Sequence, residues 1–89
     1  MQDMPRKPRG FYDKEKFFEA RMAEFIEGRR RRLGKKQAEL GEVIGISQQA
    51  FGKRVRPEEG KCNLTCIQLV KLFDALEVTD EERIALMKM

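Results

Sequence analysis

The stretch from Gln37 to Val55 constrains the fold most, because it predicts two short helices that meet at a tight corner. Apolar or small residues recur along its first half at the spacing of one helical face: Leu40, Gly41 and Ile44. Gly45 is expected just past the end of this helix, since glycine takes a positive φ without steric cost. Ser47 is a good N-cap for a second helix that runs to Val55. The sequence therefore predicts a helix, a three-residue corner and a second helix.

Residue types within this stretch follow a definite order. Counted from its start, a glutamine stands first, apolar and small residues stand fourth and fifth, a glycine stands ninth, and apolar residues stand tenth and fifteenth: Gln37, Leu40, Gly41, Gly45, Ile46 and Phe51. This pattern resembles the lambda-repressor-like (Xre-type) helix-turn-helix proteins of phages and bacteria, over about residues 26 to 87. The eighteenth place, usually apolar in that family, is Arg54 here. Either Val55 takes over the core contact, or Arg54 buries its stem and keeps its guanidinium in water.

The resemblance implies an all-α fold: a five-helix lambda-repressor-like helix-turn-helix domain with an extended N-terminal helix. A chain of 89 residues suffices for one domain, which we place at residues 11–89. Residues 1–10 combine basic residues and prolines without apolar periodicity, so we expect a flexible basic arm. This arm is either a solvated tail or a segment that follows a DNA backbone or enters a minor groove.

Three further helices are predicted outside the corner. A long one covers residues 13 to about 32. Thr65 and Gln68 form a capping box at the start of a central core helix, whose apolar residues are Leu69, Val70, Leu72, Phe73 and Leu76. Thr79 and Glu82 form a second capping box before a last helix. We expect the last helix to close the core and, secondarily, to contribute to a dimer.

The long N-terminal helix carries more apolar residues than the corner needs for its core. Its extra turns either fold back onto their own domain or meet the same helix of a second subunit, and the sequence leaves both open. Residues of this helix and of the last helix are therefore candidates for a dimer or partner surface: Phe17, Phe18, Met22, Ile84 and Met87.

Positive charge is concentrated in the first part of the chain. Residues 1–36 hold 12 Lys/Arg against 6 Asp/Glu, residues 37–61 hold 4 against 4, and residues 62–89 hold 3 against 5, within a net charge of +4. Four consecutive arginines, residues 29–32, end the long helix, where cations complement the helix dipole. With Lys35 and Lys36 they place six positive charges just before the corner, which favours a face toward a phosphate backbone.

The outward side of the second corner helix supplies the candidate base contacts, Gln48, Gln49 and Lys53. A glutamine amide matches adenine N7 and N6, and a lysine can donate to guanine O6 and N7. The two glutamines also look like the base-reading glutamines of phage repressors. Polar or cationic residues around this helix are candidate phosphate contacts, a role that the resemblance implies for the first glutamine of the corner: Lys36, Gln37, Ser47, Arg54, Arg56 and Lys61.

These features predict a sequence-specific double-stranded DNA-binding transcriptional regulator of repressor type. We expect a homodimer on an operator that is an inverted repeat, with half-sites about 10 base pairs apart. One alternative is an antitoxin that represses its own operon and holds a toxin with its long N-terminal helix. Another is a protein-interaction module that has the same fold without base reading.

Composition argues against several other classes of protein. The chain has no histidine and only two cysteines, Cys62 and Cys66, so we expect no metal site and two reduced thiols. It shows no nucleophile beside a base and no phosphate-loop motif, so we expect neither an enzyme nor a cofactor. No apolar run approaches the ~20 residues that span a bilayer, and no signal-peptide pattern opens the chain. We expect a soluble cytoplasmic protein, bacterial or phage-encoded, with no membrane partner.

Overall fold

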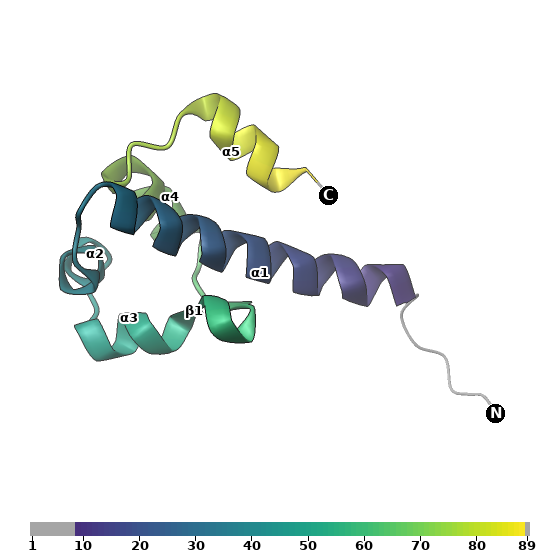
Figure 1. The fold of residues 1–89 in the computed structure, drawn as a ribbon, viewed down its shortest axis with the longest axis horizontal. Coiled ribbons are helices and arrows are strands. Elements are labelled where there is room, and N and C mark those ends of the chain that lie inside the picture. The colour runs from purple at the N-terminus through teal and green to yellow at the C-terminus, as the bar shows by residue number, and fades with distance from the viewer. Residues whose placement is uncertain (1–8, 89) are drawn as a thin grey trace.

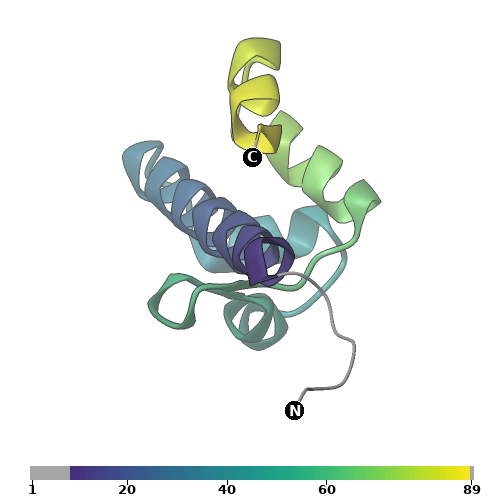
Figure 2. The same ribbon diagram turned by 90° about the vertical axis from the view of Figure 1, so that its right-hand side faces the viewer.

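A long helix runs through the middle of the molecule, and the shorter elements lie on its two sides (Figure 1). The computed structural model describes residues 9–88, with side chains from Phe17 onward. Its elements in chain order are α1 (Arg9–Arg32), α2 (Gln37–Val43), α3 (Gln48–Arg54), β1 (Val55–Arg56), the 3-10 turn η1 (Pro57–Glu59), β2 (Lys61–Cys62), α4 (Cys66–Ala75) and α5 (Asp80–Met87). Viewed from the side, α1 lies between α4 and α5 above and α3 with the β1–β2 ribbon below (Figure 2). The prediction of an all-α protein is confirmed, with a two-stranded ribbon added.

Every helix contributes to one apolar core. The buried hydrophobic residues are Met22, Ala23, Ile26, Leu40, Ile44, Phe51, Val55, Leu72, Phe73, Leu76, Val78 and Leu86. Met22 is only 1% exposed, so its assignment to a dimer or partner surface is wrong. From Phe18 onward α1 folds back onto its own domain, because its apolar stripe meets the core on this side.

Hydroxyl caps begin three of the helices, as predicted. The Ser47 Oγ accepts a hydrogen bond of 3.1 Å from the backbone N–H of Ala50. At α4 and α5 the capping boxes are complete, since Thr65 and Thr79 each exchange bonds with the residue three positions later. The start of α1 was predicted wrongly. This helix begins at Arg9, four residues before Asp13, so the last two residues of the expected arm are helical. Residues 1–8 of that arm lie outside the described residues.

The ribbon settles how the chain leaves α3. The second corner helix was expected to reach Val55, but it ends at Arg54. Val55 then takes extended φ and ψ of −119° and 99° and becomes 2% exposed. Val55 therefore takes the core contact, which confirms the first of the two alternatives for the Arg54 departure. It pairs antiparallel with Cys62, across a turn that Gly60 completes at a φ of 63°.

One prediction for α4 was also wrong. Val70 was expected in the buried face, yet it is 51% exposed. Ile67, on the same helix, is 69% exposed. The side of α4 that meets the core carries Leu72, Phe73 and Leu76. Within residues 9–88, no helix combines the length and the apolar character that a crossing of the bilayer requires.

Candidate nucleic-acid interface

The corner between α2 and α3 is fixed by contact between backbone atoms. A Cβ added at Gly41 would lie 2.7 Å from the carbonyl oxygen of Ile46 and 3.2 Å from that of Ser47. The backbone N–H of Ile46 also donates to the carbonyl of Gly41 at 2.8 Å. Gly45 takes the positive φ of +77° that the corner requires. Any larger side chain at Gly41 would push the two helices apart, so the angle between them depends on this glycine.

The three predicted base contacts lie on the solvent side of α3. Gln48, Gln49 and Lys53 are exposed, while Phe51 is 0% exposed. Because Phe51 is held in the core and Ser47 caps the first turn, the rotation of α3 about its own axis is determined. The structure thus exposes two amides and one ammonium group on the solvent side of α3, over an arc of about 140° at about 100° per residue.

The start of α2 carries the carboxylate of Glu39, which was not among the predicted site residues. Lys36 stands at the N-cap position, but a lysine side chain has no acceptor for the free N–H groups there. Instead the backbone N–H of Lys36 donates to the Glu39 Oε1 at 2.7 Å. A phosphate at this end of α2 would therefore meet the exposed Lys36 ammonium and the Glu39 carboxylate together.

Gln37 reaches back from α2 to a buried carboxylate on α1. Its Nε2 donates to the Oε1 of Glu27 at 3.3 Å, and Glu27 is only 3% exposed. Arg30 binds the same carboxylate with two hydrogen bonds, of 2.9 and 3.1 Å. Glu27 was not among the site residues predicted from the sequence. Its position four residues after Ala23 and three before Arg30, on the buried side of α1, was the available signal.

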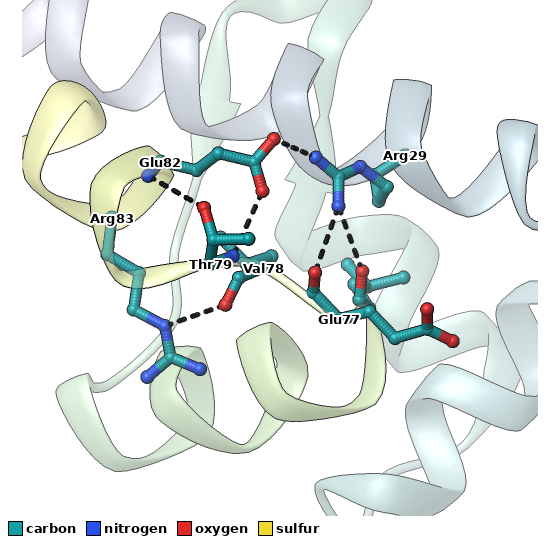
Figure 3. A network of polar contacts seen from close by, with 7 residues as sticks. Arg29, Glu77, Val78, Thr79, Glu82 and Arg83 are labelled. Atoms are coloured by element: carbon teal, nitrogen blue, oxygen red, sulfur yellow. Dashed lines mark hydrogen bonds and ion pairs between the residues drawn. The ribbon is translucent and has the colours of Figure 1, made fainter.

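The run of four arginines divides into two inner and two outer side chains. Arg29 has a side chain 10% exposed, donates to the carbonyls of Leu76 and Glu77 at 3.2 Å each, and pairs with Glu82. Figure 3 shows Arg29 above the turn between α4 and α5, where it binds both carbonyls and the Glu82 carboxylate. Arg30 is 16% exposed, whereas Arg31 is 70% exposed and the next arginine also faces solvent. Only the outer pair is available to a phosphate backbone.

The remaining candidate phosphate contacts follow α3 along the ribbon. Arg54 is half-buried and Lys61 is exposed. The Nε of Arg56 lies 3.4 Å from a carboxylate oxygen of Glu59 and 4.0 Å from one of Glu58. These two carboxylates offset part of the charge of Arg56, so we expect Arg56 to attract a phosphate less strongly than an unpaired arginine would.

The other apolar candidates are exposed on two helices. Phe17 on α1 is 68% exposed, and Ile84 and Met87 on α5 are 60% and 53% exposed. Phe18 is half-buried against the core. Beside Met87 lies an apolar groove of about 170 Å³ between α4 and α5, lined by Cys66, Leu69, Val70, Phe73, Arg83 and Met87. The predicted partner surface is therefore reduced to Phe17 and to this face of α5.

The two cysteines differ in their surroundings. Both are free thiols, and Cys66 is exposed. Burial, together with the nearby Glu19 carboxylate, raises the pKa of the Cys62 thiol to about 12. Cys62 is therefore a thiol rather than a thiolate at neutral pH. Among the side chains that the structure describes, from Phe17 to Lys88, no group of three Cys, Asp or Glu is arranged to hold a metal ion.

Comparisons with known proteins give no family for this chain. A scan against models of protein families, a search of curated proteins and a search of solved structures each returned no match.

Proposed function

We propose that this chain is a sequence-specific double-stranded DNA-binding transcriptional regulator of the lambda-repressor-like type. In this proposal α2 and α3 act as a helix-turn-helix unit, and α3 enters the major groove, which is about 12 Å wide. The observation that carries the proposal is the exposed polar face of Gln48, Gln49 and Lys53 on a helix whose rotation and angle are fixed by Phe51 and Gly41.

The chemistry of this face suits base edges. Each glutamine amide combines a donor and an acceptor, which pair with N7 and N6 of adenine, and Lys53 can donate to O6 and N7 of guanine. Since all three residues belong to the first two turns of α3, they lie where recognition helices approach the bases.

Cations and polar groups around α3 would hold the phosphates. Lys36, Arg54 and Lys61 supply positive charge, while the Gln37 amide and the Ser47 hydroxyl supply hydrogen bonds. Arg31 and Arg32, the outer pair of the arginine run, extend this surface past the start of α2. Contacts of this kind set affinity and salt dependence rather than sequence preference.

Selection from a randomised duplex pool tests the proposal. The full chain is incubated with the pool at about 150 mM salt, and bound duplexes are sequenced. Enrichment of an inverted repeat with half-sites about 10 base pairs apart is the expected result for a dimer that reads bases. Salt-sensitive binding without any enriched sequence would overturn it.

Variants then separate the two kinds of contact. Gln48→Ala or Gln49→Ala is expected to weaken binding to the enriched site by ~1–3 kcal/mol and to relax preference at single base pairs. Lys36→Ala should weaken all duplexes alike and make the slope of log affinity against log salt shallower by about one. Lys71→Ala removes the same charge from the exposed side of α4 and is the matched control, with little change expected.

A second candidate function is binding of a partner protein, either by an antitoxin or by an interaction module without base reading. The observation that favours it is the exposure of large apolar side chains, 68% for Phe17 and 60% for Ile84. The purified chain with the double change Phe17→Ser and Ile84→Ser should then lose a stoichiometric partner that the unchanged chain retains. An antitoxin should keep its DNA selection after this change, whereas an interaction module should select no duplex in either form.

A further inference from the structure

Glu27 is a buried carboxylate placed between two parts of the proposed DNA surface. It is 3% exposed, and Arg30 binds both of its oxygens, so its charge is compensated inside the protein. The Nη1 of Arg30 also donates to the carbonyl of Lys35 at 2.9 Å. One carboxylate therefore organises the end of α1 and the loop that leads to Lys36.

The same carboxylate determines how the amide of Gln37 is turned. A carboxylate only accepts hydrogen bonds, so the Nε2 side of Gln37 must face it, as the 3.3 Å contact shows. The Gln37 Oε1 then lies toward α3, 3.8 Å from the place where a Cβ on Gly52 would stand. The amide thus lies between α1 and α3, with one of its two N–H groups committed to Glu27.

We propose that Glu27 is a positioning residue for DNA binding, acting through the side chain of Gln37. This inference rests on the proposed function, in which Gln37 contacts a phosphate. By holding one N–H of the amide, Glu27 fixes the direction of the second N–H, which is the donor left for a phosphate oxygen. Preorganised donors bind more tightly than free ones because less side-chain freedom is lost on binding.

Charge and positioning predict opposite effects for one substitution. Glu27→Gln removes a negative charge near the phosphate surface, so electrostatics alone predicts tighter DNA binding. Positioning predicts weaker binding, because a glutamine at this site presents a neutral acceptor that holds both Arg30 and the Gln37 amide less firmly. The sign of the change therefore identifies the role.

A double-mutant cycle on the full chain tests the inference. Affinity for the duplex enriched by selection is measured for the unchanged chain, for Glu27→Gln, for Gln37→Ala and for the double variant, with thermal unfolding followed in parallel. We expect Glu27→Gln to weaken binding roughly fivefold or more in the unchanged background, a coupling in the usual range for neighbouring residues. In the Gln37→Ala background the same substitution should leave affinity unchanged or increase it.

Other outcomes decide against the inference in distinct ways. Equal weakening in both backgrounds would mean a general structural role, and tightening in both would mean a purely electrostatic one; either result overturns it. If Glu27→Gln does not fold, Glu27→Asp replaces it, since the shorter side chain keeps the charge but withdraws from Gln37, and the same dependence on Gln37 is expected. If the unchanged chain selects no duplex, the proposed function fails, and this inference fails with it.

Discussion

The two helical pairs of the molecule, α2–α3 and α4–α5, are held together by different means. At α2–α3 the backbone of Gly41 touches the backbone of the corner, with a carbonyl 2.7 Å from the place of a missing Cβ. At α4–α5 a side chain from another helix, Arg29, binds two carbonyls of the turn and Glu82 at the start of α5. Backbone contact allows one geometry, whereas an arginine contact can break and form again. We therefore expect the pair that carries the exposed polar face of α3 to be the more rigid of the two.

The exposed surfaces of the two pairs also differ, one being polar and the other apolar. The face of α3 is polar, with Gln48, Gln49 and Lys53, while α4 and α5 expose Val70, Ile84 and other large apolar residues. A directional hydrogen-bonding face needs a fixed orientation, because hydrogen bonds weaken steeply with misalignment. An apolar face tolerates movement, because burial of apolar area has no direction.

The largest expected effect is at the corner of α2–α3. Gly41→Val should destabilise the protein by about 3 kcal/mol, because the new side chain meets backbone atoms that cannot move aside. Denaturant unfolding measures the loss. Gly28→Val is the matched control, since nothing lies within 4 Å of a Cβ at Gly28. If the two variants are equally stable, the corner is not close-packed and the contrast between the pairs fails.

A smaller loss is expected for the link to α4–α5. Arg29→Ala should cost about 2 kcal/mol, because two carbonyls and Glu82 lose their donor. Arg32→Ala, in the same run but exposed, should change stability by less than about 0.5 kcal/mol. Hydrogen exchange should show the Arg29→Ala loss mainly in the amides of α5. Equal exchange throughout the chain would contradict a local role for Arg29.

The N-caps of α3 and α5, the second helix of each pair, give a finer test of the difference between the two pairs. Ser47→Ala and Thr79→Ala should each cost about 1 kcal/mol, since each removes the acceptor of a first-turn N–H. For Ser47 the loss should appear in global unfolding, because α3 is fixed at the rigid corner. For Thr79 it should appear first as faster exchange in α5. A global loss from both variants would show that α5 unfolds only together with the rest of the protein.

The smallest expected effect is a change in stability at acidic pH. Hydrogen bonding by the Thr79 backbone N–H, and then the Arg29 guanidinium, lowers the pKa of Glu82 below its ordinary 4.5. The folded pKa is below the unfolded one, so the stabilisation is complete above 4.5 and is lost as the pH falls through the folded pKa. The difference in Tm between the unchanged chain and Glu82→Gln should therefore shrink on acidification. A difference that stays constant down to a pH of about 2 would contradict it.

Local signals in the sequence were sufficient for the starts of α3, α4 and α5, but not for the start of α1 or for the ribbon. Ser47, Thr65 and Thr79 cap as predicted because a cap depends only on residues within three positions. The two-residue strands Val55–Arg56 and Lys61–Cys62 are too short to give a periodic pattern. They form because Val55 is buried in the core, which depends on contacts with residues distant in the sequence.

Within the candidate site, the exposed face of α3 was predictable and the role of its neighbours was not. Helical spacing from the buried Phe51 places Gln49 and Lys53, two positions to either side of it, outward. Gln48, three positions before Phe51, is exposed because it is the first residue of the helix. For Glu27 the spacing from Ala23 and Arg30 was a weaker signal, because a glutamate among arginines on a helix usually faces water. Met22 was misassigned because an apolar stripe on α1 does not by itself say whether the covering surface belongs to the same chain.

The arginine run contains two inner side chains followed by two outer ones, and this affects how the chain should be aligned with any other sequence. Successive residues of a helix are turned by about 100° from each other, yet Arg29 to Arg32 are identical letters. An alignment that places its gap one residue earlier or later across the run would score the same. It would nevertheless equate Arg29, which holds the α4–α5 turn, with a solvent-facing arginine. The buried residues before the run, Ile26 and Glu27 among them, can set the register of such an alignment.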